Sequence, residues 1–318
     1  MKELFDRVSN DCSKLVTKSY STSFSLAVNM LSTEIRKDIY NIYGFVRFAD
    51  EIVDTFHDYN KEQLMTHFER DYYLSKEQGI SLNPILNSFQ QTVNKYNIPD
   101  EMIQAFLKSM KADLSKREYQ TKEEYDEYIY GSADVVGLMC LKVFVNGNDE
   151  MYDTLKDAAM RLGSAFQKVN FLRDLKDDFE LLNRSYFPNV DLGKLNAISK
   201  QLIIDEIEAD FDYAYKNGVL KLPIEAKFGV YMAYRYYRRL LKKLEAVPSE
   251  KIMDTRIRIS DPMKINLLAR SYVKYKLKII SVSYTHLRAH ETSLHLVCRL
   301  LLEKNFHFRV LVRACSLV

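Results

Sequence analysis

The chain has 318 residues and is 47% hydrophobic, with only 9 Gly and 6 Pro, so it can bury one large core or two modest ones. Lysine and arginine number 46 against 43 aspartates and glutamates, and the net charge of +3 gives no indication of a nucleic-acid partner. The four cysteines show no metal-ligand spacing and the residues after Met1 are charged, so we expect a cytoplasmic enzyme without a signal peptide or a membrane span.

Helix signals follow one another along the chain. Ser32 with Glu34 marks the start of a helix, Pro84 and Pro99 are typical of first helical turns, and Thr121 begins a capping-box pattern. An earlier helix carries an amphipathic stripe formed by Leu4, Phe5, Val8, Cys12, Leu15 and Val16. Further helices are predicted at residues 133–145, 150–182, 200–216, 223–244 and 262–279. These signals predict an all-α, single-domain protein of roughly ten helices.

Two sets of polar residues, about 120 residues apart, each occupy one face of a predicted helix. The first set is Tyr43, Arg47, Asp50 and Asp54, and the second is Gln167, Asn170, Asp174 and Asp178. At about 100° per residue, each set falls within an arc of roughly 60 to 80°. Two facing carboxylate helices would carry excessive negative charge unless divalent cations lay between them. The sets therefore predict metal ions and an anionic ligand.

The end of the chain differs in composition from the rest. His286, His290, His295 and His307 are four of the six histidines. Residues 283–304 resemble translated adapter or vector sequence. We therefore interpret residues 281–318 as an atypical tail fused to a domain of residues 1–280. A histidine metal site, given the i, i+4 spacing of His286 and His290, and a basic amphipathic tail on a membrane surface are the alternatives.

Five segments share the order and spacing of one enzyme family. They are residues 20–27 (YSTSFSLA), 42–54 (IYGFVRFADEIVD), 130–141 (YGSADVVGLMCL), 161–178 (RLGSAFQKVNFLRDLKDD) and 185–188 (SYFP). Together they resemble the head-to-head prenyl synthases, the family of phytoene, squalene and dehydrosqualene synthases, over about residues 1–280. Within this family the chain is most similar to bacterial phytoene synthases. The resemblance implies an isoprenoid-synthase-type helical bundle with a central cavity.

The resemblance also implies a magnesium-dependent ionisation of allylic diphosphates, with Mn²⁺ as a substitute. Asp50 and Asp54 would hold metal on one wall and Asp174 and Asp178 on the other. Asn170 would be a further metal ligand, or would orient metal-bound water or diphosphate oxygens. The other groups expected at the diphosphates are Ser21, Arg47, Gln167 and Arg173.

A carbocation intermediate needs an apolar pocket, and the same segments supply one. Phe24 and Tyr43 are expected to contact the substrate, and Tyr130 to face the diphosphate or a cyclopropyl intermediate as a catalytic residue. Further apolar lining is expected from Val135, Val136, Leu138 and Met139. Close approach of helices or substrate is expected at Gly131, Gly137 and Gly163.

Ordinary structural roles are the alternatives for several of these residues. Arg173 would pair with Asp177 at i+4, Ser21 would cap a helix, and Phe24 and Tyr130 would pack in the core. Arg256 and Arg258 either match a late basic segment of the family or belong to an exposed loop. The tyrosines Tyr231, Tyr234, Tyr236 and Tyr237 are interpreted as core and groove lining.

By resemblance, the expected reaction joins two geranylgeranyl diphosphates into phytoene through a cyclopropylcarbinyl diphosphate, without NADPH. A squalene or dehydrosqualene synthase that uses farnesyl diphosphate is the alternative within the family, and pocket depth separates the two. A non-catalytic helical assembly factor is the alternative of another class, although such a protein would be expected to lose the aspartates. The expected partners are prenyl diphosphates and, by peripheral association, the inner face of a membrane.

Overall fold

A computed structural model describes residues 1–116, 118–180, 186–187, 196–252 and 257–276. The described residues are mostly helical and contain no β-strand, which confirms the predicted all-α class. The chain divides into two units, residues 1–264 and a second unit that begins at Ile265. The predicted boundary at residue 280 and the tail beyond it lie outside the described residues, so both stay predictions. In the described part of the chain, no helix is long and apolar enough to cross a membrane.

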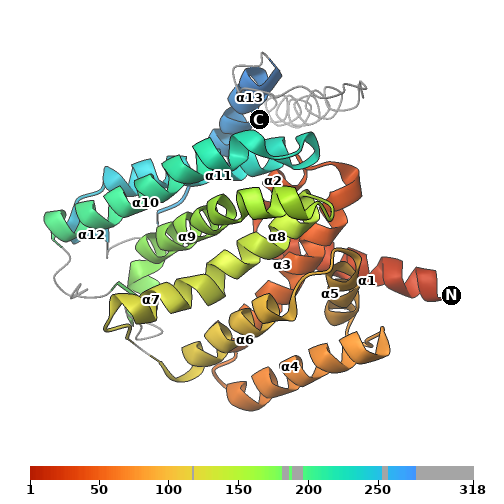
Figure 1. Ribbon diagram of the computed structural model, residues 1–318. Coiled ribbons are helices and arrows are strands. Elements are labelled where there is room, and N and C mark those ends of the chain that lie inside the picture. Colours follow the sequence, from red (N-terminus) through yellow and green to blue (C-terminus); the bar gives the residue numbers. More distant parts are fainter. Residues whose placement is uncertain (117, 181–185, 188–195, 253–256, 277–318) are drawn as a thin grey trace, which may run out of the picture. The chain divides into compact units, whose positions relative to one another are not determined.

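Figure 1 shows the helices in chain order. They are α1 (Lys2–Tyr20), α2 (Thr22–Val28), α3 (Thr33–Asp54), α4 (Lys61–Gln78), α5 (Pro84–Lys95), α6 (Asp100–Ser115), α7 (Lys122–Ile129), the π-helical segment η1 (Tyr130–Asp134), α8 (Val135–Phe144), α9 (Asp149–Glu180), α10 (Ala197–Asn217), the 3₁₀ turn η3 (Val219–Lys221), α11 (Ile224–Glu245), α12 (Ser249–Ile252) and α13 (Asp261–Lys276).

The helix starts agree with the sequence signals, but the capping bonds agree only in part. Pro84 opens α5, whereas Pro99 stands one residue before α6. Ser32 precedes α3 as predicted, yet its hydroxyl makes no capping bond. Thr121 accepts the N–H of Glu124 at 3.2 Å, while the carboxylate of Glu124 accepts the N–H of Gln120 at 3.0 Å. Thr121 thus supplies the predicted cap, while the Glu124 carboxylate bonds mainly to Gln120, one residue before the cap.

Helix α1 packs through small polar residues rather than through its apolar stripe. Its fully buried residues are Ser9, Ser13 and Thr17. Ser13 exchanges a hydrogen bond with Ser88 of α5 at 2.8 Å. A Cβ at Gly44 of α3 would lie 2.9 Å from Ser13 Oγ. An amphipathic helix normally turns its apolar face inward, but α3 and α5 offer α1 a close, polar surface that larger side chains would not fit.

A cluster of aromatic rings holds α3 in place. Phe45 is fully buried and stacks on Phe89 of α5, with ring centroids 3.9 Å apart. Phe68 and Tyr72 of α4 lie 5.3 and 5.5 Å from Phe45, and Phe106 of α6 lies 5.7 Å away. Buried aromatic pairs of this kind contribute about 0.5–1.5 kcal/mol beyond their burial. The cluster therefore positions the helix that carries the first acidic set.

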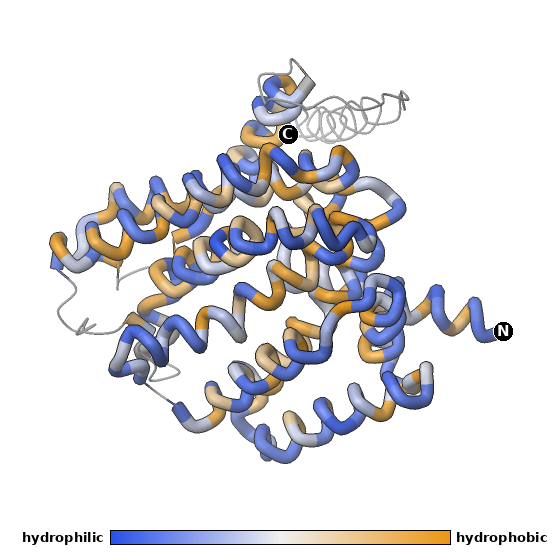
Figure 2. Tube along the Cα trace, viewed as in Figure 1, coloured by the Kyte–Doolittle hydropathy of each residue, from blue (hydrophilic) through white to orange (hydrophobic). Residues whose placement is uncertain are grey.

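The second acidic set lies on α9, between α10 on one side and α8 with η1 on the other (Figure 1). Two glycines allow this close packing. A Cβ at Gly137 would lie 2.8 Å from the carbonyl oxygen of Ala159, and one at Gly163 would lie 2.8 Å from that of Ala133. Figure 2 shows α8 as hydrophobic along much of its length, whereas the outer helix α4 is mainly hydrophilic. The predicted close approach at these two glycines is thus confirmed between helices.

Candidate functional site

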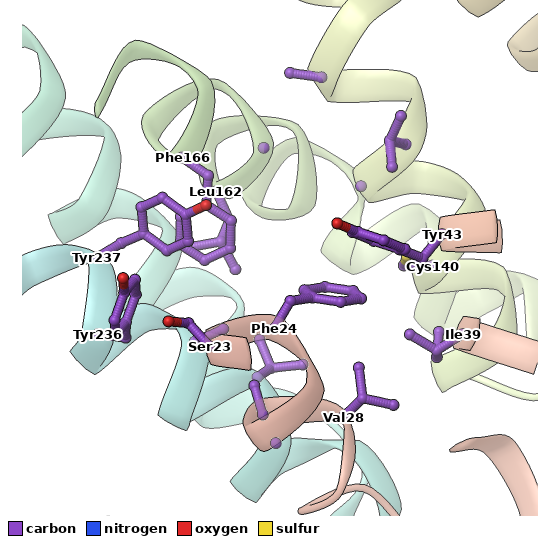
Figure 3. A pocket seen from close by; sticks show the side chains of 18 of the residues that line it. Ser23, Phe24, Val28, Ile39, Tyr43, Cys140, Leu162, Phe166, Tyr236 and Tyr237 are labelled. Atoms are coloured by element: carbon purple, nitrogen blue, oxygen red, sulfur yellow. The ribbon is translucent and has the colours of Figure 1, made fainter. Parts of the chain in front are cut away.

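A cavity of about 610 Å³ lies within residues 1–264, with walls from α2, α3, α8, α9 and α11. Figure 3 shows the rings of Phe24 and Tyr43 on one side and those of Phe166, Tyr236 and Tyr237 on the other. Phe24 stacks on Tyr43 with centroids 4.8 Å apart, and Phe166 stacks on Tyr237 at 4.1 Å. The cavity is therefore suited to a long apolar ligand.

The first acidic set lies on α3, and of its members Tyr43 lines the cavity, whereas Arg47, Asp50 and Asp54 are not among the lining residues. Arg47 donates to Asp50 Oδ2 at 2.6 Å and also pairs with Glu51. Its guanidinium lies 4.4 Å from the ring centroid of Tyr20, a cavity residue. The Nε of Arg47 is buried and has no acceptor among the described residues. Arg47 therefore combines a fixed orientation with a spare donor, which suits it to an anionic ligand.

Negative charge accumulates around Asp50. Although 36% of its side-chain surface is exposed, burial in the surrounding protein raises the pKa of Asp50 to about 7. The charge of Asp54 raises it further, Arg47 opposes the shift, and Asp113 and Glu51 add to it. The single positive charge of Arg47 does not balance the charges of these four carboxylates. A divalent cation would supply the missing positive charge and displace the proton.

The second set lies on α9 in a chain of polar contacts. Arg173 pairs with Asp174, donating through Nε at 2.9 Å and also through Nη2. Burial alone would lower the pKa of Arg173, but the bond to Asp174 raises it above its ordinary value. Tyr237 of α11 donates to Asn170 at 3.4 Å, and Asn170 donates to Gln167 at 3.4 Å. Gln167 and Arg173 both line the cavity.

Tyr43 of the first set lies near Tyr237 of α11, the residue that donates to Asn170 of the second set. Burial raises the pKa of Tyr43 to about 12, Arg47 opposes the shift, and both Asp50 on its own helix and Tyr237 on α11 add to it. Ser21 lies within hydrogen-bonding reach of Tyr43 and also caps α2 by accepting the N–H of Phe24 at 3.2 Å. The structural alternative for Ser21 is therefore confirmed, and Ser21 lines the cavity as well.

The donor set fits a hard divalent cation. In the part of the chain whose side chains are described, no three carboxylates, histidines or cysteines lie close enough together to hold a metal ion. The side chains of Asp177 and Asp178 lie outside that part. The remaining predicted ligands, Asp50, Asp54, Asn170 and Asp174, offer oxygen donors, as magnesium prefers. Burial is the main cause of the raised pKa of Asp50, and the charges of Asp54, Asp113 and Glu51 add to the rise. The metal assignment itself stays a prediction.

Only part of the predicted apolar lining of α8 reaches the cavity. Val136 lines it together with Cys140, one helical turn later. Val135, Leu138 and Met139 are buried in the core instead and do not line it. The prediction was too broad because a helix presents only one face to a cavity. Consecutive residues are rotated by about 100° around the helix axis, so a run of neighbours cannot all lie on that face.

Tyr130 lies away from the cavity lining. It begins the π segment, is 42% exposed and is not among the cavity residues. The next residue, Gly131, allows α6 to approach, since a Cβ there would lie 2.7 Å from the carbonyl oxygen of Ala105. A π segment often marks a functional position, but the catalytic role of Tyr130 stays a prediction.

The cavity also contains residues that sequence reasoning missed or left open. Arg258 lines it, as does Lys264, which donates to Thr22 at 3.0 Å. No sequence pattern distinguished Lys264, and Arg256 lies outside the described residues. Cys140 lines the apolar part, and burial raises the pKa of its thiol to about 12. With Arg173, the cavity thus has three cationic side chains on its wall.

A buried ion network holds α9 against α10. Lys168 and Asp210 are 6% and 1% exposed, and they pair at 2.7 Å. Arg161 also donates to Asp210 at 2.7 Å, and Ser164 donates to Asp134 of η1 at 2.6 Å. Burial raises the pKa of Asp134 to about 6, against the effects of Ser164, Lys168 and Arg161; Asp210 adds to the rise. The network lies one turn from Gln167 and so helps to position the cavity wall.

Comparisons with known proteins agree with this geometry. The chain matches the family model described as squalene/phytoene synthase over residues 17–262. It is 26% identical over 302 residues to phytoene synthase 1, chloroplastic, of Arabidopsis thaliana, with 88% of this chain and 68% of that protein covered. It is 28% identical over 200 residues to 4,4'-diapophytoene synthase of Staphylococcus haemolyticus, with 61% and 66% covered.

The fold comparison gives the same architecture. The crystal structure of a dehydrosqualene synthase in complex with ligand superposes with a TM-score of 0.71 at 19% identity, covering 86% of this chain and 98% of that chain. At this identity the likeness shows the fold. Against the two curated relatives, the chain spans about two thirds of their length, 68% and 66%.

Proposed function

Because the chain belongs to the squalene/phytoene synthase family of prenyltransferases, we propose that it joins two geranylgeranyl diphosphates head to head to give phytoene. Head-to-head prenyl condensation is the reaction of this family, and the chain length of the substrate is the finer part of the proposal. The observation that carries it is an apolar, ring-lined cavity with walls from α3 and α9, the two helices that carry the ion pairs Arg47–Asp50 and Arg173–Asp174.

The polar residues bind and orient the two diphosphates. Arg47 and Arg173 offer planar guanidinium donors to phosphate oxygens, and Gln167 and Asn170 supply further polar contacts. When bound by Asp50, Asp54 and the α9 aspartates, magnesium would neutralise the charge that develops on each leaving diphosphate. Arg258 and Lys264 add positive charge at the cavity wall.

The apolar residues protect the cationic steps from water. The first diphosphate leaves, and the 2,3 double bond of the second substrate attacks the resulting allylic cation. Loss of a proton then gives a cyclopropylcarbinyl diphosphate. A second ionisation, rearrangement and proton loss give the linear polyene, so no reductant is consumed. The faces of Phe24, Tyr43, Phe166 and Tyr237 stabilise cationic character without adding a nucleophile.

A direct test is to incubate the purified protein with magnesium and either geranylgeranyl or farnesyl diphosphate, then identify the hydrocarbon by mass. We expect a C40 product without NADPH, and farnesyl diphosphate as the poorer substrate. Efficient C30 formation would favour the second candidate, which the identity to 4,4'-diapophytoene synthase supports. The absence of any hydrocarbon with either substrate would favour a non-catalytic assembly factor.

The product also bears on location. A C40 hydrocarbon has negligible solubility in water, so we propose that the enzyme associates peripherally with a membrane and delivers its product there.

A further inference from the structure

Helix α1 exposes three large aliphatic side chains on one face. Leu4, Val8 and Leu15 are 51%, 48% and 65% exposed. At about 100° per residue, these three positions fall within an arc of roughly 40°. Figure 1 shows the N-terminal end of α1 extending beyond its neighbours, and Figure 2 shows hydrophobic positions there. We call this stripe, with the basic residues beside it, the α1 docking face.

The fold does not use these side chains. Ser9, Ser13 and Thr17 are the buried residues of α1, and the three aliphatic residues lie outside the buried core. An exposed leucine is unremarkable singly, but an ordered apolar stripe at helical spacing is typical of a binding surface.

The charges beside the stripe favour an anionic partner. Arg7, Lys14 and Lys18 are exposed, and none forms an ion pair with a described residue. Glu3 and Asp11 lie on the same flank and reduce the excess to one positive charge. Burial of the apolar side chains is therefore expected to contribute most of the free energy of membrane binding. The basic side chains add attraction to anionic lipid.

A second element adds apolar surface near the start of α1. Leu82, in the turn between α4 and α5, is 92% exposed, and Ile80 is 38% exposed. Asn87 joins this turn to α1, because it accepts the N–H of Ser81 at 3.3 Å and donates to Asp6 at 3.1 Å. At about 100° per residue, Asp6 lies roughly 160 to 180° around α1 from the stripe, so this turn adds apolar surface on another side of the helix and is not part of the α1 docking face.

The helix that carries the docking face also reaches the cavity. Helix α1 ends at Tyr20, and Tyr20 and Ser21 both line the cavity wall. A surface bound through α1 would therefore adjoin an element that borders the ligand space.

We propose that the α1 docking face binds the surface of an anionic lipid bilayer, with Leu4, Val8 and Leu15 entering the interface. The role of this membrane binding rests on the proposed function, because only a water-insoluble product has to be delivered to a membrane. Lipid binding itself does not depend on turnover and is measured separately.

Helix α10 provides a matched comparison. Ile198 and Leu202 are 75% and 66% exposed, so this helix also presents aliphatic side chains to solvent. Its nearby charged residues, Asp205, Glu208 and Asp212, are acidic, and Arg238 of α11 pairs with the last two at 3.5 Å. The local charge is therefore still negative, which opposes binding to anionic lipid. The proposal therefore distinguishes two helices with exposed aliphatic side chains by the charge beside those side chains.

The test is flotation of the full chain with vesicles of phosphatidylcholine alone or mixed with phosphatidylglycerol. The variants are L4Q/V8Q/L15Q on α1 and I198Q/L202Q on α10, since glutamine is a good helix former. We expect the wild type to bind mixed vesicles, the α1 variant to bind at least about tenfold more weakly, and the α10 variant to bind like the wild type. R7Q/K14Q/K18Q should lose the preference for phosphatidylglycerol.

Equal binding by the wild type and the α1 variant would overturn the proposal. A loss in the α10 variant as large as that in the α1 variant would also overturn it. If the wild type does not bind vesicles but forms a dimer that the α1 variant does not form, the α1 docking face binds a second copy of the chain and the proposal is wrong. Circular dichroism checks that the variants fold. Vesicle binding without turnover on any prenyl diphosphate would refute the proposed function alone.

Discussion

Replacing Gly163 by alanine tests how closely α9 approaches the segment before α8. A Cβ at this position would lie 2.8 Å from the carbonyl oxygen of Ala133, 3.2 Å from its carbonyl carbon and 3.4 Å from the Cα of Asp134. All three are backbone atoms, so no side-chain rotation relieves the clash. Ordinary contacts begin near 3.4 Å, and α9 would have to move by roughly half an ångström.

The expected cost follows from overpacking. Inserting a methyl group into a well-packed interface lowers the free energy of unfolding by about 1–3 kcal/mol. The higher helix propensity of alanine offsets up to about 1 kcal/mol of this loss. For a domain of this size, the net loss lowers the melting temperature by roughly 2–8 °C. Gln167 follows one turn later on the cavity wall, so we also expect turnover to fall by about tenfold.

The assay combines a thermal melt with steady-state turnover on the preferred prenyl diphosphate. Gly44→Ala is the matched control, because its nearest obstacles are Ser13 Oγ at 2.9 Å and Ser13 Cβ at 3.2 Å, on α1 rather than on the cavity wall. We expect a smaller loss of stability there and turnover close to that of the wild type. A Gly163→Ala protein that melts at or above the wild-type temperature would refute the close approach. A lower melting temperature with unchanged turnover would show that this contact does not position the site.

Three further predictions concern the metal site, the tail and one buried acid. Asp50→Asn and Asp174→Asn should each lower magnesium-dependent turnover by at least about a hundredfold while helix content stays native, and near-native turnover would remove that residue from the site. A chain ending at Ile280 should keep its melting temperature and turnover, whereas loss of either would assign the tail to the enzyme. Burial raises the pKa of Asp134 from 3.8 to about 6 despite its bond with Ser164, so its stabilising contribution is full below pH 3.8 and is lost as the pH rises through 6. Asp134→Asn should therefore be more stable than the wild type by about 1 kcal/mol above pH 6 but not at pH 4, and stability curves that stay parallel in pH would contradict this.

The sequence by itself determined the features that depend on local periodicity. The helical spacing of Tyr43, Arg47 and Asp50 required these side chains to share one face of α3, and the spacing of Gln167 and Asn170 did the same on α9. Proline and capping residues marked helix starts to within one residue. The Gly137 and Gly163 contacts were also predicted, because a residue without a side chain in a helix has little other use than close packing.

The tertiary structure decided which element covers each face. Periodicity shows that Leu4, Val8 and Leu15 share a face, but only the polar surface of α3 and α5 explains why that face points to solvent. Likewise, Val136 lines the cavity and Met139 enters the core because of what packs on either side of α8. A sequence pattern specifies the direction of a side chain about its own helix axis. The partner it meets is set by contacts between residues far apart in the chain, which no local pattern records.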